Sequence, residues 1–295
     1  MRISLIQQEF KGSKKATLSH TLSMIEKANG ELVILQELHQ NEYFCKSEDT
    51  KYFSYAENFN EDVKFWANVS KEKNIVLVTS LFEKVMDGIY YNTAVVFDKG
   101  KIAGKYRKTH IPDDPGFYEK FYFTPGDEIK PIDTSIGRLG VLVCWDQWYP
   151  EAARIMALKG AEILIYPTAI GWLMCPEIRK DELCEKENTL KEKEKMLNAW
   201  LSVQKGHAVA NGVYVVAVNR VGKEKDESGV LGGIEFWGNS FIFGPQGEEI
   251  VRIGMEEKVI NADIDLKRAK EIRKIWPFFR DRRIEIYECI KNRYC

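Results

Sequence analysis

One cysteine, one glutamate and one lysine stand out chemically, because each closely follows a short apolar run. Cys144 ends the run GVLVC and precedes an amphipathic helical pattern, which predicts a turn that exposes the thiol and aims the Trp145 backbone N–H toward it. Glu37 ends the run ELVILQE, and Lys108 follows the strand pattern in KYRK. A thiol is a nucleophile, a partly desolvated carboxylate suits a general base, and a fixed ammonium stabilises an oxyanion or a neighbouring thiolate. Together the three predict acyl transfer through a cysteine.

Each of these residues also has an ordinary structural interpretation. Free cysteines are commonly buried, a carboxylate after a strand can cap a helix or sit in a loop, and most lysines are exposed. The catalytic interpretation depends on the combination, because open α/β sheets gather their sites at the carboxyl ends of strands. The chain has four histidines without an evident triad setting, His20, His39, His110 and His207. His39 follows the glutamate and His110 follows the lysine, and we expect both to be structural.

The segments that position these residues alternate between strand and helix patterns. Apolar runs rich in β-branched residues predict strands at 3–7, 32–36, 75–82, 90–97, 139–144, 163–167, 214–219 and 240–243. Amphipathic patterns predict helices at 14–29, 62–73, 150–159 and 196–211. Turn residues at 98–100 and 244–247 predict two hairpins. An α/β fold, with a pair of mixed sheets sandwiched by helices, accounts for both kinds of connection.

Composition narrows the partners. The 295 residues include 43 basic and 44 acidic side chains, a formal net charge of −1, which does not favour nucleic acid or an anionic membrane. No run of about 18 apolar residues predicts a membrane span. The opening MRISLIQQEF is a strand pattern rather than a signal peptide, so we expect a cytoplasmic protein with a small-molecule substrate. The six cysteines lack zinc-type spacing, and we expect free thiols and no metal or other cofactor.

Two segments depart from the ordinary globular pattern of what we expect to be one domain spanning 1–295. The stretch 176–195 is crowded with Lys and Glu, which is typical of a solvated helix or an insertion near an entrance. The tail 269–295 combines Trp276, Phe278, Phe279 and Tyr287 with many basic residues. Because aromatic residues and arginines favour interfaces, this tail is expected to pack on a partner subunit or on its own domain.

The ordered motifs resemble the carbon-nitrogen hydrolase (nitrilase) superfamily over essentially the whole chain. The matching pieces are LQEL, YRKTHIP, LVCWDQWYPEAAR, YPTAIGW, KGHAVANGVYVVAVNRVG and FWGNSFIFGPQGE. The resemblance implies a four-layer αββα sandwich, usually paired across a two-fold axis into a homo-oligomer. It also implies a catalytic set of Glu37, Lys108 and Cys144, in which Lys108 and the Trp145 N–H hold the oxyanion. A second glutamate near the centre corresponds to Glu119, which would orient the substrate or the lysine.

Within that superfamily, HIPDDPGFYEKFYFTPGD, CWDQWYPE and FWGNSF are similar to the N-carbamoylputrescine amidase branch. That branch hydrolyses a terminal ureido group, giving putrescine, carbon dioxide and ammonia in polyamine biosynthesis. Relatives that bind carbamoyl amino acids tend to carry arginines where this chain has Gln147 and Trp148, or Asp113 and Asp114. An acidic, aromatic pocket favours a cationic amine, although Asp before Pro also initiates turns. The predicted substrate-binding residues are Glu42, Tyr43, Asp113, Asp114, Trp145 and Trp172. The stretch 173–194 is longer than in relatives.

Other activities remain compatible with the sequence. A different amidase of the superfamily, acting on a carbamoyl amino acid such as N-carbamoyl-β-alanine or on an aliphatic or dicarboxylate monoamide, would keep the trio and change the pocket. A metal-dependent phosphoesterase can also be a four-layer sandwich, but it needs clustered metal ligands and loses activity in EDTA. A non-catalytic binding protein is a further alternative, against which the intact trio argues.

Overall fold

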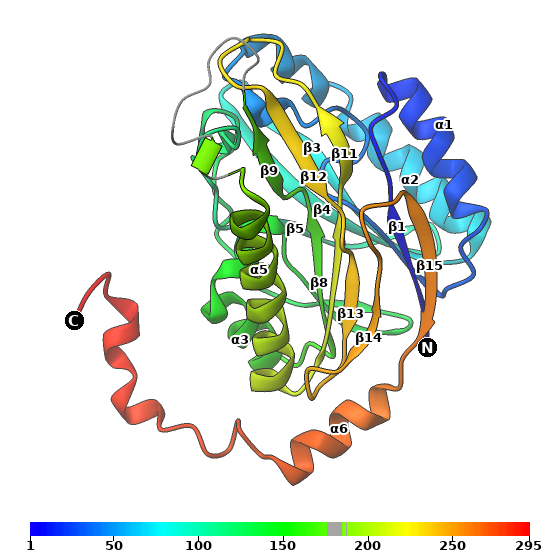
Figure 1. The fold of residues 1–295 in the computed structure, drawn as a ribbon. Helices are drawn as coiled ribbons and strands as arrows, with labels where there is room; N and C mark the ends of the chain where they lie inside the picture. The colour runs from blue at the N-terminus through cyan, green and yellow to red at the C-terminus, as the bar shows by residue number, and fades with distance from the viewer. Residues whose placement is uncertain (176–184, 187) are drawn as a thin grey trace.

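Two six-stranded sheets packed face to face form the centre of the computed structural model, which describes residues 1–175, 185–186 and 188–295 (Figure 1). The first sheet has the order β15 (Lys258–Asp263), β1 (Arg2–Gln7), β2 (Leu32–Leu35), β3 (Val76–Met86), β4 (Ile89–Asp98), β5 (Lys101–Arg107). The second has the order β14 (Glu249–Arg252), β13 (Phe241–Phe243), β10 (Tyr214–Asn219), β8 (Ile163–Thr168), β7 (Gly137–Val141), β6 (Ile132–Thr134). A smaller sheet joins β11 (Val221–Glu224), β12 (Gly233–Trp237) and β9 (Gly171–Met174).

Helices cover the outer faces of the two sheets. The first sheet is covered by α1 (Lys14–Ile25) and α2 (Phe59–Lys73), and the second by α3 (Pro150–Leu158) and α5 (Leu190–Asn211) (Figure 1). α6 (Leu266–Ile275) follows β15. Short 3-10 turns occur at η1 (Phe44–Lys46), η2 (Thr50–Ala56), η3 (Glu119–Phe121), η4 (Cys144–Trp148), η5 (Ile284–Ile286) and η6 (Glu288–Lys291). This arrangement is the predicted αββα sandwich.

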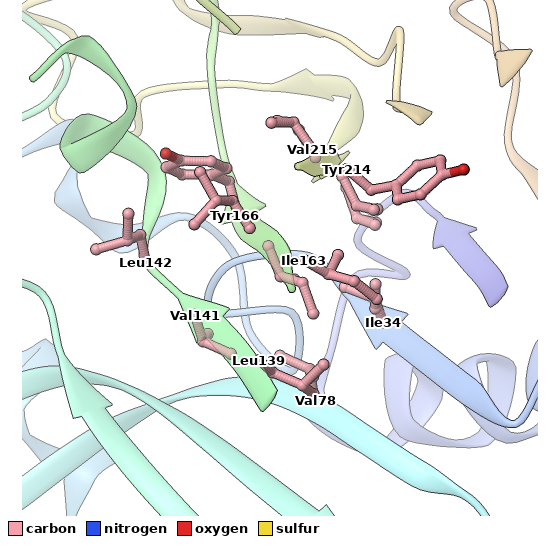
Figure 2. Close-up of a cluster of buried hydrophobic side chains, with 14 of the residues drawn as sticks. Ile34, Val78, Leu139, Val141, Leu142, Ile163, Tyr166, Tyr214 and Val215 are labelled. Carbon is pink, nitrogen blue, oxygen red and sulfur yellow. The ribbon is translucent and has the colours of Figure 1, made fainter. Parts of the chain in front are cut away.

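The core explains why the central strands are apolar throughout. In β2, Leu32 and Ile34 pack between the two sheets, whereas Val33 and Leu35 face α1 and α2. Side chains of a strand alternate between faces, so a strand buried on both faces is mainly apolar. Figure 2 shows Ile34 among side chains of the opposite sheet, including Ile163. The continuous apolar runs of the sequence are therefore the inner strands of the sandwich.

Strand direction brings the candidate residues to one end of the sandwich. β1, β2 and β3 are parallel, and β5 runs the same way because β4 is antiparallel to both β3 and β5. In the second sheet β7, β8 and β10 are parallel. The carboxyl ends of β2, β5 and β7 lead into Glu37, Lys108 and Cys144. The topology thus delivers the three residues to a common edge, as expected for α/β sheets.

Helix ends follow the usual capping chemistry. α2 has Glu61 and Asp62 in its first turn and ends at Asn74, which adopts the left-handed conformation with φ 55°. In α5 the Thr189 side chain accepts a hydrogen bond from the Glu192 N–H, and Gly212 closes the helix with φ 57°. These caps place both helix boundaries at residues whose types favour them.

The predicted elements are confirmed with shifted boundaries, and several were missed. α5 begins at Leu190, so part of the charged stretch is its first turns, while residues 176–184 and 187 lie outside the described part of the chain. The short strands β6, β9, β11, β12 and β15 and helix α6 were not predicted, since each is brief and only partly apolar.

The expectation of free thiols is only partly met. Cys45 and Cys144 are free and buried. Cys289 and Cys295 form a disulfide, with Cα atoms 5.8 Å apart and within bridging distance. Cys175 is also disulfide-bonded, so the expectation is wrong for these three cysteines. Cys184 lies outside the described residues.

Most of the C-terminal segment beyond α6 lies away from the sandwich (Figure 1). Its Phe279 ring packs against the guanidinium groups of Arg154 on α3 and Arg273 on α6, at 5.2 and 5.3 Å. α6 buries Ala269 and Ile272 against the body. Beyond it, large apolar side chains are exposed: Trp276, Phe278, Ile284, Ile286, Tyr287, Ile290 and Tyr294. Exposed apolar side chains gathered in one segment are typical of an interaction surface. Within the described residues, none of the helices combines the length and apolar character that crossing a membrane requires.

Candidate active site

Glu37 is held at the end of β2 with one carboxylate oxygen saturated and the other free. Its Oε1 accepts hydrogen bonds from Lys108 Nζ at 2.8 Å and from Asn92 Nδ2 at 2.7 Å. Asn92 is itself oriented by the Ser80 hydroxyl, which donates to its Oδ1 at 2.9 Å. Glu37 Oε2 is buried and has no hydrogen-bond partner among the described residues. A buried acceptor without a partner is costly, so this oxygen is the one available to take a proton.

Lys108 lies between two carboxylates in a fully buried cluster. It follows β5 directly, and its Nζ donates to Glu119 Oε2 at 2.6 Å as well as to Glu37. Glu119 Oε1 accepts a hydrogen bond from the Tyr43 hydroxyl at 2.7 Å. Lys108, Glu37, Glu119 and Tyr43 are all 0% exposed. The structure therefore assembles the glutamate, the lysine and the second glutamate into one hydrogen-bonded unit.

Burial and mutual charge set the protonation of this unit. Burial raises the pKa of Glu119 to about 7, although the Lys108 ammonium opposes the shift. Burial by itself would lower the pKa of Lys108, but the Glu119 and Glu37 carboxylates outweigh it and raise that pKa well above its usual value. Burial and the Glu119 charge raise the pKa of Tyr43. The lysine is therefore a permanent cation and the tyrosine a neutral donor.

Cys144 is the first residue of η4, on a strained turn that follows β7. Its φ is +40°, a left-handed conformation that non-glycine residues adopt rarely and that is often found at functional sites. Its Sγ lies 3.8 Å from the Ala169 carbonyl oxygen, just beyond β8. Burial raises the pKa of the Cys144 thiol well above its usual value, the Glu37 charge adds to this, and Lys108 opposes it. The resting thiol is therefore protonated rather than the thiolate that a nearby lysine suggested, so attack requires a base.

The turn that carries Cys144 is fixed by Asp146. Asp146 Oδ2 accepts from the Val143 N–H and from the Tyr106 hydroxyl, each at 2.9 Å, and Oδ1 lies 2.7 Å from His110 Nδ1. Trp145 occupies the first turn of η4, where backbone N–H groups have no partner within a helix. Its N–H therefore has the position along the chain that an oxyanion donor needs.

His110 and His39, the histidines that follow Lys108 and Glu37 in the sequence, have structural surroundings. The His110 ring stacks on Tyr149 with centroids 3.8 Å apart and pairs with Asp146, so it supports the turn beyond the cysteine. His39 is buried edge-on against Trp66. Burial, with smaller effects of Arg220 and Lys14, lowers the pKa of His39 to about 3, so its ring is neutral.

The predicted substrate-binding residues fall into separate surroundings. Tyr43 belongs to the buried cluster, whereas Glu42 is already paired with Lys46 Nζ at 3.1 Å and with the Tyr55 hydroxyl at 3.2 Å. The Trp172 Nε1–H donates to the Lys193 carbonyl at 3.3 Å, and the Trp172 ring lies 4.9 Å from Lys193 Nζ. Among the described residues no hydrogen bond, ion pair or ring contact links Glu42 or Trp172 directly to Cys144, and Trp172 and Cys144 belong to the same buried hydrophobic cluster.

Asp113 and Asp114 lie exposed on the loop between His110 and Glu119. The Asp113 carboxylate lies 3.9 Å from Lys120 Nζ, and the backbone carbonyl of Asp114 accepts a hydrogen bond from the Phe117 N–H at 2.8 Å. The Phe117 ring packs against Tyr43 with centroids 5.7 Å apart. This turn therefore borders the buried cluster without entering it.

The side chain of Gln147 is hydrogen-bonded to α5. Its Oε1 accepts hydrogen bonds from Trp200 Nε1 at 2.6 Å and from Gln204 Nε2 at 2.8 Å, both on α5. Gln147 therefore links η4 to α5. The absence of an arginine at this position says little about whether the substrate has a carboxylate. Trp145, next to the cysteine, remains partly exposed and is the predicted aromatic neighbour of the thiol.

Sequence patterns missed the residues that orient the cluster. Ser80 and Asn92 are polar positions inside long strands, and they could have been noticed only as interruptions of the apolar runs of β3 and β4. Asp146 lies in the CWDQW motif but was not singled out. Among the described residues, no group of three or more His, Cys, Asp or Glu side chains is placed to hold a metal ion.

Comparisons with known proteins identify the family of the chain. The carbon-nitrogen hydrolase family model matches residues 2–274. An N-carbamoylputrescine amidase of Solanum tuberosum is 39% identical over 93% of this chain and 88% of its own. A citrullinase of Francisella tularensis is 37% identical over 100% and 99% of the two chains. The crystal structure of a carbon-nitrogen hydrolase from Helicobacter pylori G27 is 50% identical, covers 100% of this chain and 99% of that chain, and has a TM-score of 0.93. The chain is therefore an amidohydrolase that belongs to the carbon-nitrogen hydrolase family.

Proposed function

We propose that this amidohydrolase cleaves the terminal ureido group of N-carbamoylputrescine, with Cys144 as nucleophile, Glu37 as general base and Lys108 as oxyanion stabiliser. The observation that carries the proposal is the buried Glu37 carboxylate, whose Oε1 is saturated and whose Oε2 has no partner among the described residues. A second support is the relative named N-carbamoylputrescine amidase, 39% identical over most of both chains. The reaction would supply putrescine for polyamine biosynthesis in the cytoplasm.

In the first half of the reaction Glu37 Oε2 removes the proton of Cys144, and the sulfur attacks the ureido carbonyl carbon. The tetrahedral oxyanion is stabilised by the Lys108 ammonium and the Trp145 N–H. The terminal nitrogen then takes the proton from Glu37 and leaves as ammonia, so the enzyme holds an N-alkylcarbamoyl thioester on sulfur. Glu119, tied to Lys108 at 2.6 Å, keeps the ammonium in place throughout.

In the second half a water molecule replaces the departed ammonia. Glu37 removes a proton from the water as it attacks the thioester, and the sulfur leaves and is protonated again. The product carbamate decomposes to carbon dioxide and putrescine. No step of this scheme requires a metal ion or an organic cofactor.

Recognition of the distal ammonium is assigned to the acidic residues Asp113, Asp114 or Glu42. Asp113 and Asp114 are favoured because their turn packs against Tyr43 through Phe117, while Glu42 already pairs with Lys46. Replacing both aspartates with Asn should raise KM for the amine substrate far more than for a neutral amide. An equal rise for both substrates would show that this turn does not read the charge.

The substrate proposal is tested by ammonia release from N-carbamoylputrescine, N-carbamoyl-β-alanine and a simple aliphatic amide, with EDTA present. We expect the carbamoyl diamine to be preferred and Cys144→Ala to release no ammonia. Lys108→Met should lose about 100-fold or more in rate, the usual effect of removing an oxyanion donor. A preference for either other substrate would keep the cysteine mechanism and overturn the substrate.

Citrulline is a second candidate, because a relative named citrullinase is 37% identical over the full length of both chains. Citrulline carries the same terminal ureido group and a distal amine, but it adds a carboxylate. Adding citrulline to the panel separates the two ureido substrates. Higher kcat/KM for citrulline would point to a carboxylate partner that the acidic turn does not supply.

We also propose that the chain assembles into a homo-oligomer through its C-terminal segment. The supporting observation is the run of exposed apolar residues after α6, which lies outside the part matched by the family model. Light scattering of the chain cut after Ile275 should show a smaller assembly than the full chain. An unchanged number of subunits in the assembly would exclude the segment as the interface.

A further inference from the structure

Arg220 is a fully buried guanidinium that faces the loop carrying the proposed base. It lies between β10 and β11 and is 0% exposed. Its Nη2 donates to the carbonyls of Leu38 at 2.9 Å and Asn41 at 3.1 Å, and more weakly to that of Glu37 at 3.4 Å. Its Nη1 donates to Asn41 as well, at 3.1 Å. One side chain therefore holds the carbonyls of Glu37, Leu38 and Asn41, all in the loop that follows β2.

Glu224 completes the contact on the other side of the same loop. It pairs with Arg220 Nη1, and its Oε2 accepts the Tyr43 N–H at 2.6 Å. Lys46 Nζ lies 3.5 Å from the same oxygen. Tyr43 in turn donates its hydroxyl to Glu119. The Arg220–Glu224 pair thus holds both ends of the loop from Glu37 to Tyr43.

The loop has a conformation that needs such support. Leu38 adopts φ +45°, in the left-handed region that leucine disfavours. Its N–H donates to Ser80 Oγ at 3.1 Å and its carbonyl accepts from Arg220, so side chains satisfy both of its backbone groups. Strained backbone persists when its surroundings determine it, and it clusters where geometry serves a reaction. Leu38 directly follows the proposed base.

A second contact ties Arg220 to the strand end beside the cysteine. The Thr168 carbonyl accepts both the Arg220 N–H at 3.2 Å and the Glu37 N–H at 3.4 Å. The next residue, Ala169, supplies the carbonyl that lies against Cys144 Sγ. The backbone of Arg220 and its side chain therefore fix Glu37 relative to the same strand end that contacts the thiol.

We propose that Arg220 and Glu224 are positioning residues that hold Glu37 Oε2 in line with the Cys144 thiol. The inference rests on the proposed cysteine mechanism and adds to it a pair that touches neither substrate nor reacting atoms. A buried ion pair is weak evidence for stability, since apolar residues of similar volume often serve as well. Here Nη2 donates only to carbonyls of the loop that carries the base, Nη1 donates to Asn41 in that loop and to Glu224, and Nε has no hydrogen-bond partner among the described residues. The pair acts on the rate of proton removal rather than on affinity.

The test compares Arg220→Met and Arg220→Lys with Arg273→Met as a matched control. Arg273 also clamps backbone carbonyls, those of Asn211, Gly212 and Ala161, but at the opposite ends of β8 and β10. For each variant kcat and KM for ammonia release are measured on the best substrate of the parent, together with the rate of Cys144 alkylation by iodoacetamide against pH and the melting temperature.

We expect Arg220→Met to lower kcat about 10- to 100-fold, the effect of a small misplacement of a reacting group. KM should change little, and alkylation at neutral pH should slow by a similar factor. Arg220→Lys, which keeps the charge and fewer donors, should be intermediate. Arg273→Met should lower the melting temperature and leave kcat and alkylation unchanged.

Glu224→Gln keeps an acceptor for the Tyr43 N–H and serves if the Arg220 variants do not fold. It should lower kcat less than Arg220→Met and leave KM unchanged. The inference would be overturned if folded Arg220→Lys and Glu224→Gln kept the kcat and the alkylation rate of the parent. It would also be overturned if kcat fell in proportion to the loss of melting temperature in the Arg220 and Arg273 variants alike. If the parent itself releases no ammonia from any amide, the proposed function fails instead.

Discussion

Asn92 offers a sharp test of how Glu37 is held, because its amide makes one of the two hydrogen bonds to Glu37 Oε1, at 2.7 Å. Both residues are 0% exposed. A hydrogen bond to a charged group contributes about 1.5–3 kcal/mol, and about 1.4 kcal/mol corresponds to a tenfold change in rate. If the bond serves to align the base, Asn92→Leu should lower kcat about 10- to 100-fold. The Lys108 contact at 2.8 Å should keep the carboxylate in the site.

The assay for Asn92→Leu is steady-state ammonia release with denaturant unfolding measured in parallel. The variant leaves the Ser80 hydroxyl without its acceptor, so we expect about 1–3 kcal/mol of lost stability as well. Asn211→Leu is the matched control, since Asn211 is 3% exposed and donates to the His207 carbonyl at the far end of α5. It should lose stability and keep its kcat. Full kcat in Asn92→Leu would refute the alignment of the base by this amide.

Three further predictions follow from the burial of Glu119 and His39 and from the close packing at Gly126. Burial raises the pKa of Glu119 to about 7, so the folded protein binds this proton more tightly than the unfolded chain does. The free energy of unfolding therefore falls as the pH rises from 4.5 to about 7. Glu119→Gln should flatten that fall, measured by denaturant titrations at several pH values. Burial lowers the pKa of His39 to about 3, so stability is lost as the pH falls from 6.5 toward 3, and His39→Phe should retain more of it. A Cβ on Gly126 would lie 2.2 Å from the Arg107 carbonyl oxygen, so Gly126→Ala should lower the free energy of unfolding by about 1–3 kcal/mol. The same change should lower kcat, because it shifts the neighbouring Lys108. Denaturant unfolding and ammonia release measure the two effects.

The central strands and the reactive trio could be predicted because their signals are local. β2 is buried on both faces, so Leu32–Leu35 is apolar without interruption and stands out in the sequence. Glu37, Lys108 and Cys144 follow such runs, and strand ends are where α/β sheets place their sites. Their chemical types then suffice to suggest the reaction.

The supports of the site could not be predicted, because their partners are distant along the chain. Arg220 contacts the carbonyl of Leu38, 182 residues away in sequence, and this separation leaves no periodic trace. Asn92 is one polar residue in β4, and the sequence does not distinguish a buried side chain there from one that faces a loop or solvent. Gln147 stands where relatives tend to carry an arginine, and its hydrogen bond with Trp200 on α5, 53 residues away, could not be predicted from that place.

The central claim is that Cys144 carries the substrate during turnover. The most direct measurement is peptide-mapping mass spectrometry of the enzyme quenched during turnover of N-carbamoylputrescine. Cys144→Ala and Cys45, the other buried free thiol among the described residues, serve as references. We predict an adduct on the Cys144 peptide equal in mass to the substrate less one ammonia, none on Cys45, and no ammonia release by Cys144→Ala. Turnover by Cys144→Ala, or an adduct on another residue, would contradict the mechanism.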